Sequence, residues 1–233
     1  PSMDDGIFNP DLYLERLERS IIESIPAPVA VIVSFPSNPT AQVVTLEFYE
    51  EVVKIALKYN VYILSDLAYA EIYYDNSPPP SILQIPKAKE VAVEFTSMSK
   101  TYAMAGWRIG FAVGNIRLIN ALTRIKSYLD YGAFTPVQVA AATALNGPQD
   151  CVQEIRSTYQ KRRDVLINSM ARAGWNIPSP KASMFAWAPI PDKYKDKGSL
   201  EFAKELMLKA DVAVSPGCLL YTSDAADDSW GVG

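Results

Sequence analysis

Short apolar runs alternate along the chain with longer amphipathic stretches. The apolar runs lack the regular polar–apolar alternation of a half-exposed strand, which indicates strands that are buried on both faces. Such strands are typical of parallel sheets that helices cover. The pattern therefore predicts an α/β fold in which a mostly parallel sheet is sandwiched by helices. The predicted strands cover residues 29–35, 61–64, 91–95 and 109–113.

The amphipathic stretches predict helices between and after these strands. In residues 45–60, Thr45 is a candidate N-cap and acidic residues occupy the first turns. Gly174 lies just past a long predicted helix, at a position where glycine often ends helices. The predicted helices cover residues 45–60, 116–129, 136–146, 149–173 and 200–210.

The pattern changes after Gly174 to that of a smaller unit, with short strands predicted over residues 184–188 and 212–215. We assign residues 1–160 to part of a large domain and residues 161–217 to part of a small C-terminal α/β domain. Residues 218–233 fit neither pattern, and we interpret them as a non-native tail.

The composition excludes several classes of function. Among the 233 residues there is no histidine, which excludes Ser–His and Cys–His catalysis and histidine metal sites within this chain. The net charge is −4 and the basic residues are scattered, so no nucleic-acid footprint is predicted. No apolar run approaches the ~18–20 residues of a membrane span, and no signal peptide is evident. Cys151 and Cys218 match no metal spacing, and we expect a reducing compartment, the cytoplasm.

Polar residues gather where the predicted strands end. Asn38 follows the first strand, Asp66 the second, and Ser97 and Lys100 the third, while Arg108 comes just before the fourth. Ligands of open parallel sheets bind outside the carboxyl ends of the strands. Each residue also has a structural interpretation: a turn for Asn38, a loop or cap for Asp66, a surface position for Lys100 and an ion pair for Arg108. Their order and shared edge favour one site.

Three segments carry a resemblance to a known family. SMSKTYAMAGWRIG (residues 97–110), FPSNPT (35–40) and SDLAYAEIYYD (65–75) resemble motifs of the class I/II aminotransferases, which are fold type I enzymes dependent on pyridoxal 5′-phosphate (PLP). The resemblance extends from about Asn9 to Gly217 and implies the PLP transferase large domain and part of its small domain. It is strongest toward bacterial glutamate–pyruvate (alanine-forming) aminotransferases, with LL-diaminopimelate aminotransferases as near neighbours. The family's NPTG reads NPTA here, with Ala41, which we interpret as a subgroup trait.

The resemblance implies roles around the cofactor ring. Lys100 is the lysine that binds the PLP aldehyde and then moves a proton at the substrate α-carbon. Asp66 pairs with the ring nitrogen and keeps it protonated. Asn38 and Tyr69 hydrogen-bond the 3-oxygen of the ring. Lys100, Asp66 and Tyr69 are thus the candidate catalytic residues.

The resemblance also implies a phosphate site and a shared interface. Ser97 and Arg108 hold the cofactor phosphate, because the guanidinium fork matches phosphate oxygens. Ser99 is a further candidate for the same anion. Residues 131–135 reach the neighbouring subunit's site in a homodimer with shared active sites. The alternative is that Tyr131 and Phe134 are only interface or core aromatics.

Family members are longer at both ends, so we expect a fragment that is truncated at both ends. The groups that cradle the phosphate, stack on the ring and bind the substrate carboxylate are expected outside this chain. In particular, no arginine follows Arg172. We therefore expect that the isolated chain does not transaminate.

The implied reaction is ping-pong transfer of an amino group between an amino acid and a 2-oxo acid, with alanine/pyruvate and glutamate/2-oxoglutarate as the pairs. Three alternatives remain open. One is another fold type I chemistry, such as C–S β-elimination, which PLP supports equally. The others are LL-diaminopimelate aminotransferase activity and a PLP-binding sensor module of a transcription regulator.

Overall fold

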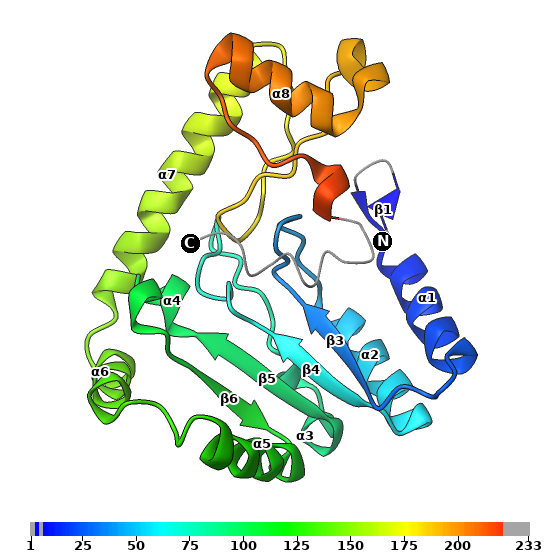
Figure 1. Cartoon of the computed structure of the whole chain (residues 1–233), viewed down its shortest axis with the longest axis vertical. Coiled ribbons are helices and arrows are strands. Elements are labelled where there is room, and N and C mark those ends of the chain that lie inside the picture. The colour runs from blue at the N-terminus through cyan, green and yellow to red at the C-terminus, as the bar shows by residue number, and fades with distance from the viewer. Residues whose placement is uncertain (1–2, 5–6, 221–233) are drawn as a thin grey trace.

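The computed structural model describes residues 3–4 and 7–220. Four strands form one sheet in the order β3-β4-β5-β6 (Figure 1). The first three are parallel to one another, and β6 is antiparallel to β5. The prediction of an α/β fold with a mostly parallel sheet is confirmed. The strands are β3 (Ala30–Ser34), β4 (Tyr62–Asp66), β5 (Ala92–Ser97) and β6 (Gly110–Gly114). In a separate two-stranded sheet, β1 (Met3–Asp4) pairs antiparallel with β2 (Ile7–Phe8).

The predicted helices form close to their expected bounds. In α2, the Thr45 hydroxyl accepts a hydrogen bond from the Phe48 amide at 3.3 Å, as the N-cap prediction required. Asn60 ends α2 with a left-handed backbone. The helices are α1 (Pro10–Glu23), α2 (Leu46–Tyr59), α3 (Ala88–Val91), α4 (Met98–Thr101), α5 (Ile116–Leu129), α6 (Thr135–Asn146), α7 (Asp150–Arg172) and α8 (Gly198–Ala210). Short 3₁₀ turns cover Ile82–Gln84, Ala105–Trp107, Asp192–Lys197 and Gly217–Leu220.

The core lies between α2 and one face of the sheet. Val52 and Ala56 of α2 are buried with Val33 and Ile63 of the strands in one apolar cluster. On the opposite face, Ile32 remains 72% exposed in the described part of the chain. Residues alternate between the faces of a strand, so Ser34 and Asp66, which are neighbours in register, belong to the less covered face.

Glu94 is a carboxylate on the buried face of β5. Its side chain accepts hydrogen bonds from the Ser81 hydroxyl at 2.9 Å and from the Ile82 amide at 3.2 Å. Burial raises the pKa of Glu94, and these two donors lower it in part. A carboxyl group whose pKa is raised in the folded state contributes stability at low pH. This contribution is complete below the unfolded-state pKa of about 4.3 and is lost as the pH rises through the folded-state pKa.

We therefore expect Glu94→Gln to stabilise the protein more at pH 7 than at pH 4, because the amide has no proton to lose. Thermal unfolding at both pH values measures this difference. Glu90→Gln, at an exposed position on α3, serves as the matched control. Equal behaviour of the two variants would contradict the assignment of a raised pKa to Glu94.

Two predicted strands are wrong. Residues 184–188 and 212–215 form no strand in the structure. A strand needs a neighbour to pair its backbone groups, and apolar sequence alone does not supply one. In this region the described pairing is a single antiparallel bridge between Ala182 and Tyr73.

Helix α7 runs from the edge of the sheet to the end of the molecule where α8 lies (Figure 1). It continues unbroken through residue 160, so the division into residues 1–160 and 161–217 stays a prediction. Most of the interpreted tail, residues 221–233, lies outside the described residues. No helix of the described residues is long and apolar enough to cross a bilayer.

Candidate functional site

The carboxyl ends of β3, β4 and β5 meet at one edge of the sheet. β4 ends at Asp66, and β5 ends at Ser97, directly before the short helix α4 that contains Lys100. Asn38 lies in the loop after β3. β6 is antiparallel and begins at Gly110 opposite Ser97, so Arg108 enters at the same edge. The topology thus brings the predicted residues to one edge of the sheet.

Asp66 is held by donors from two directions. Its Oδ2 accepts from the Ser34 hydroxyl at 3.3 Å, and its Oδ1 accepts from the Ala68 amide at 3.0 Å. Each carboxylate oxygen can accept a further bond, so one can still receive a donor from a ligand. Sequence reasoning missed Ser34, and the available signal was its place as a polar residue at the end of an apolar strand.

Tyr69 lies next to Asn38, Lys100 and Phe185. The residue is 6% exposed, and its hydroxyl accepts a hydrogen bond from Asn38 Nδ2 at 3.4 Å. Lys100 Nζ lies 5.9 Å from the centroid of the ring, and the Phe185 ring packs edge-on at 5.6 Å. Burial and then the charge of Asp66 raise the pKa of Tyr69, while the bond from Asn38 lowers it. The phenol therefore keeps its proton at neutral pH and can donate it to a hydrogen-bond acceptor.

Ser97 and Arg108 form their hydrogen bonds locally. The Ser97 hydroxyl caps α4 by accepting from the Ser99 amide at 3.2 Å, and its own proton can be donated elsewhere. Arg108 is exposed, has a left-handed backbone (φ 52°), and donates from Nη1 to the Ala105 carbonyl at 3.1 Å. Such a backbone is uncommon outside glycine and often marks a functional position. The structure therefore groups Asn38, Asp66, Tyr69 and Lys100, and places Ser97 and Arg108 at the same edge.

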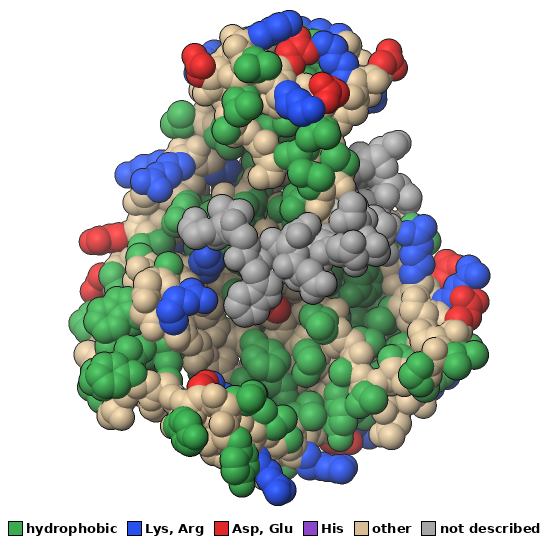
Figure 2. Space-filling model, viewed as in Figure 1, with side chains coloured by type: hydrophobic (Ala, Val, Ile, Leu, Met, Phe, Trp, Pro, Cys, Tyr) green, Lys and Arg blue, Asp and Glu red, His purple; other side chains and the backbone are tan. Residues whose placement is uncertain are grey.

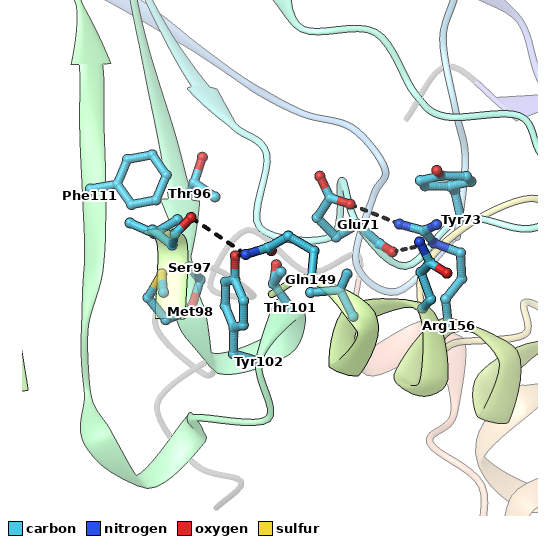
Figure 3. A pocket seen from close by; sticks show the side chains of 13 residues that line it. Glu71, Tyr73, Thr96, Ser97, Met98, Thr101, Tyr102, Phe111, Gln149 and Arg156 are labelled. Carbon is cyan, nitrogen blue, oxygen red and sulfur yellow. Dashed lines mark hydrogen bonds and ion pairs between the residues drawn. The ribbon is translucent and has the colours of Figure 1, made fainter. Parts of the chain in front are cut away.

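A cavity of about 390 Å³ lies beside α4 and α7 (Figure 3). Of the six predicted residues, its described lining includes Ser97, so the cavity is not centred on the site around Tyr69. Two pairs of its polar side chains are bonded to each other: Arg156 with Glu71, and Tyr102 with Gln149. The cavity therefore adjoins the predicted site at Ser97 and does not contain the residues around Tyr69.

Helices α5 and α6 present a broad apolar surface (Figure 2). Tyr131 and Phe134, in the loop between the two helices, are 92% and 73% exposed. This exposure excludes the alternative that they are core aromatics of the described fold. The other large exposed apolar residues here are Ile116, Ile125, Tyr128, Leu129, Val139 and Leu145.

Comparison with known proteins identifies one family. A family model described as aminotransferase class I and II matches residues 9–230. AatC of Rhizobium meliloti (strain 1021), whose name assigns it to the aminotransferases, is 59% identical over 214 residues, which is 92% of this chain and 51% of that protein. Glutamate-pyruvate aminotransferase AlaC of Escherichia coli (strain K12) is 58% identical over 205 residues, covering 88% of this chain and 50% of AlaC.

Other comparisons agree at lower identity. LL-diaminopimelate aminotransferase of Moorella thermoacetica (strain ATCC 39073 / JCM 9320) is 45% identical over 199 residues, which is 83% of this chain and 50% of that protein. The solved structure of an aromatic aminotransferase from Pyrococcus horikoshii OT3 matches with a TM-score of 0.82 at 26% identity, over 94% of this chain and 57% of that chain. The chain spans about half the length of the curated relatives it matches.

Proposed function

This chain belongs to the family of class I and II aminotransferases, and on that premise we propose that the enzyme carrying it transfers an amino group between an amino acid and a 2-oxo acid. One observation supports the proposal above the others. An amine (Lys100), a carboxylate (Asp66) and a buried neutral phenol (Tyr69) meet at the carboxyl edge of a parallel sheet. The identity to AlaC favours alanine/pyruvate and glutamate/2-oxoglutarate as the substrate pairs.

Aminotransferases of this family depend on PLP, and the donor set of this chain fits that cofactor. Asp66 offers a fixed carboxylate for a ring nitrogen. Tyr69 has a protonated hydroxyl and Asn38 an amide for a ring oxygen. Ser97 and Arg108 offer the hydroxyl and guanidinium that suit a phosphate.

When bound, PLP supplies an electron sink for the electron pair released from the substrate α-carbon. Lys100 would have two successive tasks: its Nζ would bind the aldehyde carbon of the cofactor, and after the substrate amine has displaced it, the freed Nζ would move a proton from the substrate α-carbon. The carboxylate of Asp66 would keep a proton on the ring nitrogen. The Tyr69 hydroxyl would donate a hydrogen bond to the ring oxygen, and Asn38, which donates to that hydroxyl, would orient it.

We further propose a homodimer with shared active sites in the cytoplasm. An apolar surface as broad as that of α5 and α6 usually marks an interface, and the exposed Tyr131 lies within it. Residues 131–135 would then reach the partner's site. The free thiols Cys151 and Cys218 are in keeping with a reducing compartment.

A product assay on the full-length holoenzyme tests the function. With glutamate and pyruvate we expect equal amounts of 2-oxoglutarate and alanine, at a rate of about 1–10³ s⁻¹. Pyruvate with free ammonia from a cysteine conjugate would instead indicate β-elimination. Preferred transfer to or from LL-diaminopimelate would move the assignment to that group of enzymes. Sequence-specific DNA binding without turnover would indicate the sensor module.

A further inference from the structure

Two arginines of α7 lie on one face of the helix and point to the segment that contains Tyr69. Arg156 and Arg163 are seven residues apart, which is close to two helical turns. Both contact residues 69–75, the chain segment that follows Asp66. Each arginine combines an ion pair with an acidic residue and a stacked aromatic ring from this segment.

Arg156 binds the first half of the segment. Its Nε donates to the Glu71 carbonyl at 3.0 Å, and its Nη2 donates to Glu71 Oε2 at 2.9 Å. The guanidinium carbon lies 3.7 Å from the centroid of the Tyr73 ring, a cation–π distance (Figure 3). Backbone and side chain of the segment are thus both bound to α7.

Arg163 binds the second half. Nη1 and Nη2 donate to the two oxygens of Asp75 at 2.8 and 3.0 Å, the bidentate geometry in which arginine pairs most strongly with a carboxylate. Nη1 also donates to the Pro180 carbonyl at 3.2 Å, and the guanidinium carbon lies 4.6 Å from the centroid of the Tyr74 ring. The Arg163 side chain is 9% exposed, whereas the Asp75 side chain is 62% exposed, so the guanidinium is buried and the carboxylate faces water.

A second segment, residues 180–185, pairs with residues 72–74 and continues to Phe185. The Ser183 amide donates to the Ile72 carbonyl at 2.7 Å, and the Tyr74 amide donates to the Lys181 carbonyl at 3.0 Å. The buried Tyr74 hydroxyl donates to the Ser183 carbonyl at 2.5 Å. Contacts therefore run without a break from α7 through both segments to Tyr69 and the Phe185 ring that packs on it.

We propose that Arg156 and Arg163 are positioning residues, which fix segments 69–75 and 180–185 against α7 and thereby hold in place Tyr69, beside Lys100, and the Phe185 ring that packs on Tyr69. The inference rests on the proposed function, since it assigns Tyr69 the ring oxygen of the cofactor. Neither arginine contacts Lys100 or Asp66 among the interactions of the described residues. Their effect on the reaction passes through Tyr69.

The test compares variants of the full-length enzyme. Asp75→Asn and Arg163→Lys each remove the bidentate fork while they keep side chains of similar size, so both are expected to fold. Arg162→Ala is the matched control, because Arg162 is the adjacent exposed arginine of α7. Tyr69→Phe reports the role of Tyr69 itself. Thermal unfolding establishes that each variant is folded.

Two readouts go beyond activity. Asp75→Asn and Arg163→Lys are called the fork variants. In the cofactor-free protein, the rate of hydrogen exchange at the Tyr74 and Ser183 amides is expected to rise about tenfold in the fork variants and not in Arg162→Ala. In the holoenzyme, the visible absorbance of the bound cofactor changes with pH. The pH at the midpoint of this change is expected to shift by roughly half a unit or more in Tyr69→Phe and in the fork variants alike. The accompanying kinetic change is expected in kcat more than in KM.

The outcomes separate the two proposals. If Tyr69→Phe leaves the midpoint unchanged, the role of Tyr69 in the proposed function fails, and hydrogen exchange alone then judges whether the arginines fix the segments. If Tyr69→Phe shifts the midpoint while both fork variants behave like Arg162→Ala in exchange and absorbance, the positioning proposal is overturned. Parallel shifts in the fork variants and Tyr69→Phe, with raised exchange, support it.

Discussion

Lys100→Ala is expected to abolish both the covalent attachment of PLP and amino-group transfer by the full-length enzyme. The amine of Lys100 lies beside Tyr69 at the carboxyl edge of the sheet, where the other predicted cofactor residues meet. In the proposed function, its loss would remove the nucleophile for the aldehyde and the base for the substrate α-carbon. Proton transfer alone contributes about 10²–10⁴-fold to rate, so we expect a loss of at least this size.

Borohydride trapping measures the first part of this prediction. The protein is mixed with PLP, reduced and digested, and the peptide that carries the pyridoxyl group is identified by mass spectrometry. We expect the label on the peptide that contains Lys100. Lys89→Ala, at an exposed position on α3, is the control and is expected to label normally. Selective label on another lysine, or equal labelling of Lys100→Ala, would refute the assignment.

The parts of the fold that local sequence determines were predictable. Helix α2 has its cap at Thr45, its acidic first turn and its apolar periodicity within a single stretch of chain, and the structure follows them closely. Asp66 and Lys100 were predictable because each follows a buried strand at the edge where ligands bind. The role of each, however, came from the resemblance to a family and not from the strand pattern.

Other features of the fold and of the site could not be predicted, because they depend on contacts between distant parts of the chain. Residues 184–188 have the composition of a strand, but whether a strand forms depends on a neighbour that the apolar pattern does not specify. The ion pair between Arg163 and Asp75 joins positions 88 apart, and neither residue differs locally from an ordinary surface charge. From the sequence alone, Phe185 is expected to be a core aromatic. In the structure, the bridge between Ala182 and Tyr73 brings Phe185 close to Tyr69, and their rings are in contact.

Asp66→Asn is expected to lower kcat of the full-length enzyme by roughly ten- to a hundredfold. The amide oxygen can still accept from the Ala68 amide, and the amide nitrogen, which takes the place of the other carboxylate oxygen, can donate to the Ser34 hydroxyl, so the substitution keeps the shape of the side chain and removes the charge. A hydrogen bond to a charged group contributes about 1.5–3 kcal/mol, and in the proposed function this is the interaction that would keep the ring nitrogen protonated. PLP affinity and kcat at saturating substrates measure the loss.

Ser34→Ala is the matched control for Asp66→Asn, because it removes one donor at 3.3 Å and leaves the carboxylate in place. A hydrogen bond of this length belongs at the lower end of the ordinary contribution of about 0.5–1.5 kcal/mol. We therefore expect kcat of Ser34→Ala to fall by about twofold. If Asp66→Asn were as active as the wild type, Asp66 would be a structural residue at the end of β4, whose role is its bond to the Ala68 amide. A large loss in Asp66→Asn with a small one in Ser34→Ala would instead assign the effect to the charge, which is the feature that amino-group transfer requires of this position.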